Sequence, residues 1–301
     1  MKKINKNVIR DHIKKRFRKE EKNVSELKHH IAIPTGKTQV SRPKGFTKEH
    51  ESKSINYHNI KNEVKETFSK KDEDRVATGI PGLDEVMEGG LRKHTVNIIG
   101  GGAGSGKSIC SMQYLVNGIE NYKENGVYIS FEESENRILE DYEGFDWKLK
   151  DKIKNKQLAI LNYSPEQVNK VLEAGGGVIR DTVDAIKAKR LVIDSVTAFS
   201  LLYNSGLERR KALLQLFEAI GKWGVTAMLI AEQEEDPDQH HASTIEFEVD
   251  GVILLYNIRK GDIRERSLEV FKMRATQHAG RIFPMRIDES GITIYPKETV
   301  F

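Results

Sequence analysis

Apolar runs and amphipathic stretches alternate along residues 75–301, whereas apolar residues are few and scattered in residues 1–74. Five short runs rich in β-branched residues are typical of strands buried on both faces: TVNIIG, GVYISF, LAILNY, KRLVID and VTAMLIAEQ. The stretches between them have helical spacing, as in SICSMQYLVNGI, VIRDTVDAIKAK and LERRKALLQLFEAIGKW. This alternation predicts an α/β fold with a doubly wound, mainly parallel sheet.

The two ends of residues 75–301 have different patterns. Near the C-terminus, the runs DGVILLYNI, RSLEVFKM, FPMRID and GITIY are separated by turns, without helical stretches between them. We therefore expect antiparallel strands to extend the sheet. At the start, RVATGIPGLDEVMEGGL (residues 75–91) predicts two glycine-rich turns around a short helix that begins near Leu83.

The stretch GGAGSGKS fits the phosphate-loop pattern G-x-x-x-x-G-K-[ST] and lies between a predicted strand and a predicted helix. Its glycines let successive N–H groups turn toward a phosphate, and the helix N-terminus adds a partial positive charge. Lys107 brings a full charge to the outer phosphates, and Ser108 offers a hydroxyl to Mg²⁺. The predicted site for a purine nucleoside triphosphate consists of Gly101, Gly102, Ala103, Gly104, Ser105, Gly106, Lys107 and Ser108.

Carboxylates at the ends of two later strands are candidates for the chemistry. Asp194 follows a short apolar strand, and ligands of open α/β sheets bind at that edge, so we expect Asp194 to face the phosphate loop and hold Mg²⁺ through water. Glu132 and Glu133 end a strand that we expect to neighbour the loop, and one of them can polarise a water molecule. The plainer interpretation of each is an acid at a turn or helix start, and Ser134 is expected to cap the helix that follows.

Phosphoryl transfer also needs a cation, and no arginine lies near the loop in the sequence. Candidates occur in KMRATQH, where period-two spacing places Lys272, Arg274 and Thr276 on one face of a strand, with His278 beyond them. This face can project toward the nucleotide of a neighbouring subunit. A positive face on an edge strand can equally serve to prevent aggregation, and the residues alone favour neither interpretation.

Charge is distributed unevenly over the 301 residues, whose net charge is +4. Residues 1–74 contain 20 Lys and Arg against 11 Asp and Glu, whereas residues 75–301 contain 29 against 34. The single cysteine, Cys110, excludes an internal disulfide framework and a cysteine-only metal site, and we expect it to be a small buried residue. No apolar run is long enough to cross a membrane and the N-terminus has no apolar signal core, so we expect a soluble, cytoplasmic protein.

Residues 1–74 form a basic, low-complexity extension that has too few apolar residues to build a core. Ile9, Ile13 and Phe17 recur at helical spacing, so an amphipathic helix over roughly residues 5–30 is consistent with the pattern, and loop is expected beyond it. The extension could lie on nucleic acid, dock on a partner or lie on a membrane surface without inserting stably. It could equally be a largely disordered, solvated tail. His29 and His30 do not have the spacing of a metal site.

Seven separated motifs resemble the KaiC domain of the RecA-like ATPases, in the same order and at similar spacing over residues 75–301. They are TGIPGLDEVMEGGL, GGAGSGKS, YISFEES, KRLVIDSVTA, EFEVDGVILL, KMRATQH and GITIYP. The chain resembles single-domain archaeal and bacterial members of this family, whereas the clock protein KaiC carries two such domains. The resemblance implies a RecA-like P-loop fold and a homo-oligomer, a hexameric or filament-like ring with ATP at each subunit interface.

Site roles follow from the same resemblance. It implies that Gly104, Gly106, Lys107 and Ser108 bind phosphates and Mg²⁺, with Asp194 as the Walker-B acid. Glu132 and Glu133 match the family's catalytic pair, and Lys272, Arg274 and His278 match residues offered in trans to the neighbour's phosphate. One departure is Ala275, where the family usually has glycine. With one domain, autophosphorylation cannot be assumed.

Three functions remain as hypotheses at this stage. The first is a Mg²⁺-dependent ATPase with sites completed between subunits, whose nucleotide state changes a surface seen by a protein partner of unknown identity. The second is a DNA-binding recombinase or recombination mediator that uses the basic extension, although no helix-turn-helix or helix-hairpin-helix domain precedes the core. The third is a nucleotide sensor that does not hydrolyse ATP, against which the Glu pair and Asp194 argue.

Overall fold

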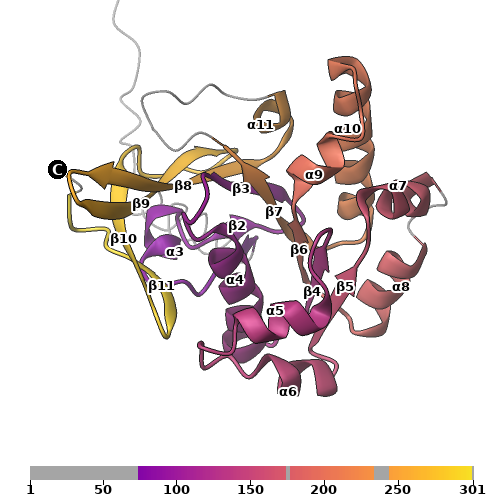
Figure 1. Cartoon of the computed structure of the whole chain (residues 1–301), viewed down its shortest axis with the longest axis horizontal. Coiled ribbons are helices and arrows are strands. Elements are labelled where there is room, and N and C mark those ends of the chain that lie inside the picture. Colours follow the sequence, from indigo (N-terminus) through magenta and orange to yellow (C-terminus); the bar gives the residue numbers. More distant parts are fainter. Residues whose placement is uncertain (1–73, 174–176, 234–243, 300–301) are drawn as a thin grey trace, which may run out of the picture. The chain divides into compact units, whose positions relative to one another are not determined.

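The computed structural model describes residues 74–173, 177–233 and 244–299, and these contain the predicted doubly wound sheet (Figure 1). Within these ranges one sheet has the strand order β11–β10–β9–β8–β3–β7–β6–β4–β5. Its parallel part consists of β8 (Gly251–Lys260), β3 (Val96–Gly101), β7 (Thr226–Glu232), β6 (Arg190–Asp194), β4 (Gly126–Ser130) and β5 (Leu158–Asn162). The antiparallel part is β9 (Ile263–Met273), β10 (Ile282–Asp288) and β11 (Gly291–Ile294).

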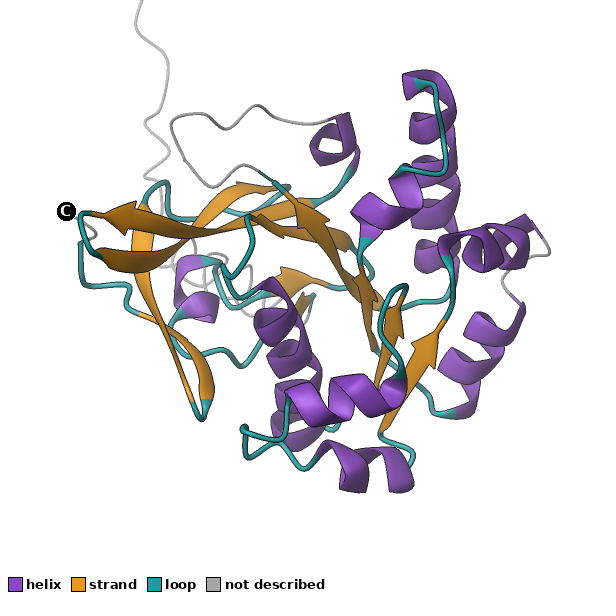
Figure 2. Cartoon of the chain, in the orientation of Figure 1, coloured by secondary structure: helices purple, strands orange, loops and turns teal. Residues whose placement is uncertain are grey.

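Helices cover both faces of the sheet (Figure 2). On one face lie α3 (Leu83–Val86), α4 (Lys107–Tyr122), α5 (Glu135–Asp141) and α6 (Leu149–Lys154). The other face carries α7 (Pro165–Glu173), α8 (Gly177–Ala185), α9 (Val196–Ser200) and α10 (Gly206–Lys222). Helix α11 (Thr244–Glu248) precedes β8, and a two-stranded ribbon pairs β1 (Arg75–Val76) with β2 (Leu91–Arg92).

The direction of β8 corrects one prediction. We expected DGVILLYNI to begin the antiparallel extension, but β8 runs parallel to β3, and only β9, β10 and β11 run antiparallel to their neighbours. A parallel strand requires a crossover connection, and the crossover from β7 to β8 includes α11, which spans only five residues. One helical turn is too short to produce a recognisable apolar period. The sequence patterns also failed to predict α6, α7 and α9.

Each face of the sheet has its own apolar core because the parallel strands are buried on both faces. Tyr128 and Val192 point into the core beneath α4, whereas Ile129 and Ile193, one position along, point into the core beneath α10. Cys110 is fully buried on α4, as predicted, and burial raises the pKa of its thiol to about 12. Ser134 caps α5 by accepting a hydrogen bond from the backbone N–H of Arg137, also as predicted.

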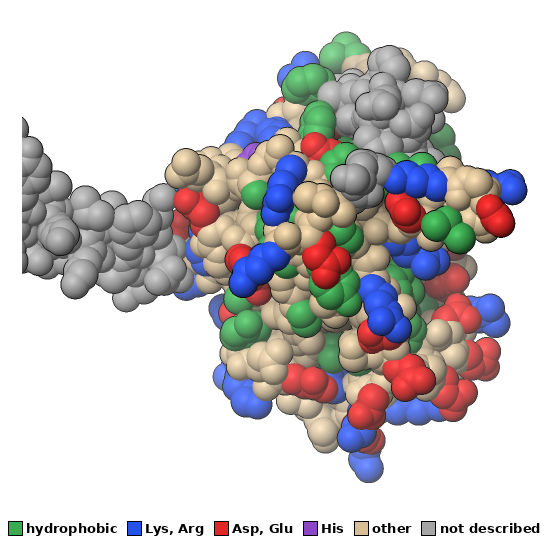
Figure 3. Space-filling view, turned by 90° about the vertical axis from the view of Figure 1, so that its left-hand side faces the viewer, with side chains coloured by type: hydrophobic (Ala, Val, Ile, Leu, Met, Phe, Trp, Pro, Cys, Tyr) green, Lys and Arg blue, Asp and Glu red, His purple; other side chains and the backbone are tan. Residues whose placement is uncertain are grey.

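Charges of both signs are interspersed over the face beside β9 and β10, with small apolar patches between them (Figure 3). None of the helices within the described ranges combines the length and the apolar composition that a membrane-spanning helix requires. The expectations for residues 1–73, including the amphipathic helix near residues 5–30, lie outside the described residues.

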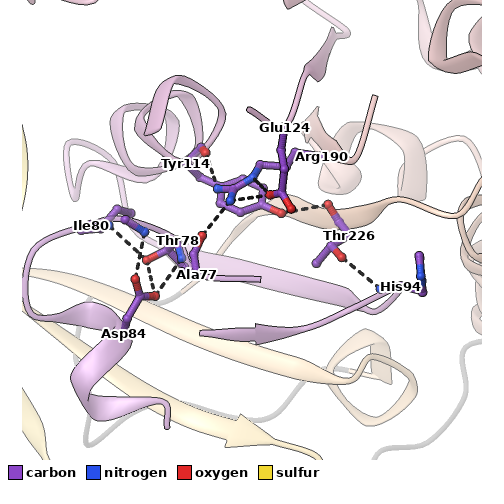
Figure 4. A network of polar contacts seen from close by, with 10 residues as sticks. Ala77, Thr78, Ile80, Asp84, His94, Tyr114, Glu124, Arg190 and Thr226 are labelled. Atoms are coloured by element: carbon purple, nitrogen blue, oxygen red, sulfur yellow. Dashed lines mark hydrogen bonds and ion pairs between the residues drawn. The ribbon is translucent and has the colours of Figure 1, made fainter. Parts of the chain in front are cut away.

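A fully buried arginine connects β6 to α4 and to the segment that follows β1 (Figure 4). Arg190, at the start of β6, donates to the carbonyl oxygens of Tyr114 and Ala77, each at 2.8 Å, and pairs with Glu124 at 2.6 Å. Its guanidinium lies over the ring of Tyr114, 4.5 Å from the centroid, and a Cβ on Gly118 would collide with it. This buried charge is therefore matched by a carboxylate, two carbonyl oxygens and an aromatic face.

Replacing Arg190 by Ala is expected to lower the free energy of unfolding by about 3 kcal/mol or more, because three acceptors lose a buried charged donor. The matched control is Arg92→Ala, since Arg92 pairs with Asp74 at 3.3 Å in an exposed position and such a pair contributes about 1 kcal/mol or less. Urea unfolding of both variants measures the difference. Equal losses would contradict a structural role for the Arg190 network.

Candidate functional site

The phosphate-loop segment joins β3 to α4 in the conformation that the glycines allow. Gly104 and Gly106 have φ angles of 71° and 102°, in the region that favours glycine. A Cβ at position 106 would also lie 2.8 Å from Ile287 Cδ1. Lys107 is the first residue of α4, and its Nζ donates to the Gly102 carbonyl at 2.8 Å, which places the ammonium across the loop. A helix N-terminus, a cation and a glycine-rich turn thus converge at one point.

Asp194 faces the phosphate loop, as its position at the end of β6 predicts. Its Oδ2 accepts hydrogen bonds from the Ser108 hydroxyl at 2.9 Å and from the Tyr128 hydroxyl at 2.7 Å. Burial, together with the nearby carboxyl groups, raises the pKa of Tyr128 well above its usual range, so Tyr128 keeps its proton at neutral pH. The neighbouring hydroxyl and carboxylate oxygens of Ser108 and Asp194 are the kind of ligands that suit Mg²⁺, which commonly takes one or two protein oxygens beside phosphate and water.

Glu132 and Glu133 reach the same region, but from a strand that does not neighbour the loop as predicted. Strands β7 and β6 separate β4 from β3. The backbone after β4 is fixed by two hydrogen bonds, since the Glu133 N–H donates to Ser130 Oγ at 2.9 Å and Asn162 Nδ2 donates to the Glu133 carbonyl at 2.7 Å. Partial burial, followed by the charges of Asp141 and Asp194, raises the pKa of Glu133. A raised pKa makes this carboxylate a better proton acceptor.

These groups surround one cavity of about 200 Å³. Five predicted residues line it: Lys107, Ser108, Glu132, Glu133 and Asp194. The other lining residues are Ser130, Ser195, Ile230 and Glu232. Glu232 was not among the predicted residues. It lies at the tip of β7, and the rule that places Asp194 at the carboxyl edge of a parallel sheet applies to it equally.

Lys272 and Arg274 lie beside the amino ends of the parallel strands, whereas their own phosphate loop lies at the carboxyl ends, the opposite edge of the sheet. The Arg274 N–H donates to Asp250 O, and the Asp250 N–H donates to Val96 O at the first residue of β3. The phosphate loop follows the last residue of β3, which is about 17 Å away at the usual rise of a strand. Lys272 Nζ donates to the carbonyls of Glu246 and Val249, each at 2.7 Å, and burial lowers its pKa. The cavity therefore contains neither cation.

The path of the KMRATQH segment also differs from the prediction. Strand β9 ends at Met273, so Arg274 and Thr276 lie in the turn that follows and do not share a strand face with Lys272. Ala275, the residue that departs from the family pattern, has a φ of 52°. This left-handed conformation costs a residue with a Cβ about 1–2 kcal/mol, and it reverses the chain immediately after Arg274. His278 lies further along the loop, with Nδ1 3.4 Å from the Ala279 carbonyl oxygen.

An arginine that sequence analysis did not select lies beside the phosphate loop. Arg266 Nε is 3.4 Å from the Gly104 carbonyl, and Asn257 Nδ2 donates to the same oxygen at 3.4 Å. Arg266 pairs with Asn257 across the β8–β9 ladder, and Asn257 Oδ1 is buried without a hydrogen-bond partner among the described residues. The interpretation that no arginine lies near the loop holds along the sequence but is wrong in space. Pairing β8 with β9 as a hairpin in the correct register would have revealed it.

Comparison with known proteins supports the resemblance to the KaiC domain that the motifs indicated. The family model of the KaiC ATPase matches residues 76–299. The chain belongs to the KaiC ATPase family. It therefore has the RecA-like fold that the motifs predicted, and the described residues form a KaiC-type ATPase domain.

Three relatives show how much of a KaiC protein this domain represents. The circadian clock oscillator protein KaiC of Parasynechococcus marenigrum is 34% identical over 230 residues, which cover 74% of this chain and 45% of that protein. A UPF0273 protein of Thermotoga maritima is 32% identical over 237 residues, with 74% of this chain and 97% of that protein covered. The crystal structure of the KaiC-like protein PH0186 from Pyrococcus horikoshii OT3 superposes with a TM-score of 0.65 at 34% identity, covering 74% of this chain and 99% of that one. The chain thus spans less than half of the KaiC clock protein but nearly all of the two shorter relatives.

The hydrogen bond from Tyr128 to Asp194 can be tested in this KaiC-family domain by removing one hydroxyl. Tyr128→Phe is expected to lower the free energy of unfolding by about 1.5–3 kcal/mol, because its acceptor is a carboxylate. The matched control is Tyr114→Phe, another buried tyrosine, whose hydroxyl donates to the Thr226 carbonyl at 3.1 Å. A neutral acceptor predicts a loss of about 0.5–1.5 kcal/mol. Urea unfolding compares them, and a larger loss for Tyr114→Phe would contradict the assignment.

Proposed function

We propose that this domain hydrolyses ATP with Mg²⁺ at sites that two copies of the chain complete together. The observation that carries the proposal is the separation of its parts. The phosphate loop, Asp194 and the Glu pair surround one cavity, whereas Lys272 and Arg274 lie at the other edge of the same sheet. A single copy therefore offers the nucleotide-binding half of a site at one edge of its sheet and the cationic half of another site at the opposite edge.

In the proposed site each residue has a separate task. Lys107 binds the outer phosphate oxygens, and the loop N–H groups hold the phosphates in place. Ser108 and Asp194 hold Mg²⁺, which when bound neutralises charge on the phosphate oxygens. Glu132 and Glu133 orient the attacking water and accept its proton, a task for which the raised pKa of Glu133 is suited.

The cations come from the second copy in this proposal. Arg274 is about half exposed and its guanidinium NH1 lies 3.8 Å from Asp250, so its head is accessible to a neighbour. Lys272 and Arg274 would neutralise the charge that develops on the transferring phosphoryl group, the part played by an arginine finger. The repeated head-to-tail contact that this requires generates a closed ring or a filament, and a hexameric ring is the form that the family resemblance implies.

The size of the cavity supports a shared site. Sites for small ligands usually have about 300–1,000 Å³, whereas this cavity has about 200 Å³. It matches the phosphate end of ATP better than the whole molecule. The base and ribose would lie toward Arg266 and the outer surface, where a second copy can cover them. A change in nucleotide would then change the contact between copies, which is the basis we propose for a regulatory switch read by a protein partner.

Variants at the two edges test the shared site. Lys107→Ala is expected to abolish ATP binding, whereas Arg274→Ala should bind ATP normally yet turn it over about 10³–10⁵ times more slowly. A Glu132→Gln/Glu133→Gln protein should bind ATP without hydrolysing it while still presenting Arg274. Mixing it with Arg274→Ala should restore phosphate release, because some interfaces then combine two intact halves. Arg274→Ala that hydrolyses ATP normally in the assembled protein would refute the proposal.

A second candidate activity, nucleic-acid binding, rests on the surplus of Lys and Arg in residues 1–74. Contacts to phosphates release counterions, so the affinity for single-stranded DNA should fall steeply as salt rises, by roughly 0.7 logarithmic units per contact for each tenfold increase. Titrations of the whole chain and of a chain lacking residues 1–73 measure this. If the whole chain does not bind at low salt, the extension has another role.

A further inference from the structure

The segment from Arg75 to Gly90 has no part in the proposed chemistry. It contains the two glycine-rich turns that were predicted from the sequence. The structure folds it against the loop that links β9 to β10. Arg75 is the centre of this contact, and its side chain is only 6% exposed. Its NH1 donates to the carbonyls of Met87 and Gly90, at 3.3 and 3.0 Å, and to Thr276 Oγ1 at 2.8 Å.

Two further hydrogen bonds tie the same loop to the same segment. Glu88 Oε2, which pairs with Arg75 NH2 at 3.1 Å, also accepts the Gln277 N–H at 3.1 Å. The Ala279 N–H donates to the Val86 carbonyl at 3.1 Å. The contacts thus fall at positions 276, 277 and 279, between Arg274 and the start of β10 and on either side of His278.

The segment itself is held rigidly and so can act as a support. The Asp84 carboxylate accepts hydrogen bonds from the Thr78 N–H at 2.8 Å, the Thr78 hydroxyl at 2.7 Å and the Gly79 N–H at 2.9 Å. The carbonyl of Ala77 accepts from buried Arg190. Arg75 therefore joins the loop to a part of the chain that is anchored in the core.

We propose that Arg75, together with Glu88, is a positioning residue that sets the direction in which Arg274 and His278 are offered to a neighbouring copy. The inference rests on the proposed function, since it concerns the half-site that acts in trans. Arg274 itself is held at the end of β9, where its N–H donates to the Asp250 carbonyl at 2.8 Å and its NH2 to the Phe247 carbonyl at 2.9 Å, while its side chain stays about half exposed. The contacts of Arg75 and Glu88 hold the loop beyond it, up to and past His278. The planar fork of an arginine can serve the carbonyls, Thr276 and Glu88 together, whereas a lysine ammonium cannot satisfy all of them in one geometry.

Arg75→Lys is the test, because it keeps the charge and most of the volume. Misplacement of a catalytic group by about 1 Å can cost on the order of 100-fold in rate, so we expect kcat to fall by about 10- to 100-fold while ATP affinity and KM stay within about twofold. The matched control is Arg92→Lys, since Arg92 pairs with Arg75 across the β1–β2 ribbon but its guanidinium contacts exposed Asp74. Arg92→Lys should retain the kcat of the unaltered protein.

Mixing separates a misplaced loop from general damage. Arg75→Lys copies keep an intact phosphate loop, so adding the Glu132→Gln/Glu133→Gln protein, whose own Arg274 loop is intact, should restore phosphate release. The reference is the same mixture made with Arg274→Ala. Rescue of Arg274→Ala but not of Arg75→Lys overturns the role of Arg75 and leaves the proposed function standing, whereas failure of the reference mixture overturns both.

Two other results bear on the inference. An unchanged kcat for Arg75→Lys overturns it. If thermal unfolding shows that Arg75→Lys is unfolded at the assay temperature, Glu88→Gln replaces it, since this variant removes the charge that pairs with Arg75 and keeps an oxygen for the Gln277 N–H. Glu88→Gln should lower kcat at unchanged KM and be rescued in the same mixture, and normal turnover or a failed rescue again overturns the inference.

Discussion

Strand direction is the constraint on which the rest of this molecule depends. The residues that follow parallel strands lie at one edge of the sheet, formed by the carboxyl ends of those strands. The last residues of an antiparallel strand lie at the other edge, formed by the amino ends of the parallel strands. Strands β3, β4, β6 and β7 bring the phosphate loop, the Glu pair, Asp194 and Glu232 together. Strand β9 runs the opposite way and carries Lys272 and the turn with Arg274 to the far edge. Separation of the cations from the nucleotide is thus a property of the topology and not of any single side chain.

Buried polar contacts that stabilise the domain also position the residues of the candidate site. Arg190 begins β6, the strand that ends at Asp194, and binds the middle of α4, the helix that begins at Lys107. It therefore fixes the start of the strand, which is remote from the cavity, against the middle of the helix. At the cavity itself the same two elements meet again through Ser108 and Asp194. β6 is thus held against α4 at both of its ends, which is the kind of support that a preorganised site requires.

Local patterns revealed the parts of the site that are local in sequence. The phosphate loop, Asp194 and the Glu pair each lie within a few residues of a strand end, so periodicity and one motif were enough to find them. The last two residues of the loop line the cavity together with Asp194 and the Glu pair. Arg266, the parallel direction of β8 and the contacts of Arg75 depend instead on the pairing of segments far apart in the chain. A one-residue shift in register would turn Arg266 to the other face, and nothing in its own neighbourhood specifies that register. The turn at Ala275 was missed for a different reason, since alanine gives no signal of a positive φ.

The two halves of the proposed site are held by different physical means. On the nucleotide side, Lys107 at a helix N-terminus and the hydroxyls of Ser108 and Tyr128 are fixed by the fold itself. On the cation side, a turn with a strained alanine depends on one buried guanidinium and one carboxylate from another segment. Side-chain clamps of this kind can change without disturbing the sheet, because they lie outside its ladder of hydrogen bonds. In the proposed mechanism, binding of a copy's own nucleotide and action on that of a neighbour would therefore be physically separable, so that each could be altered while the other is kept.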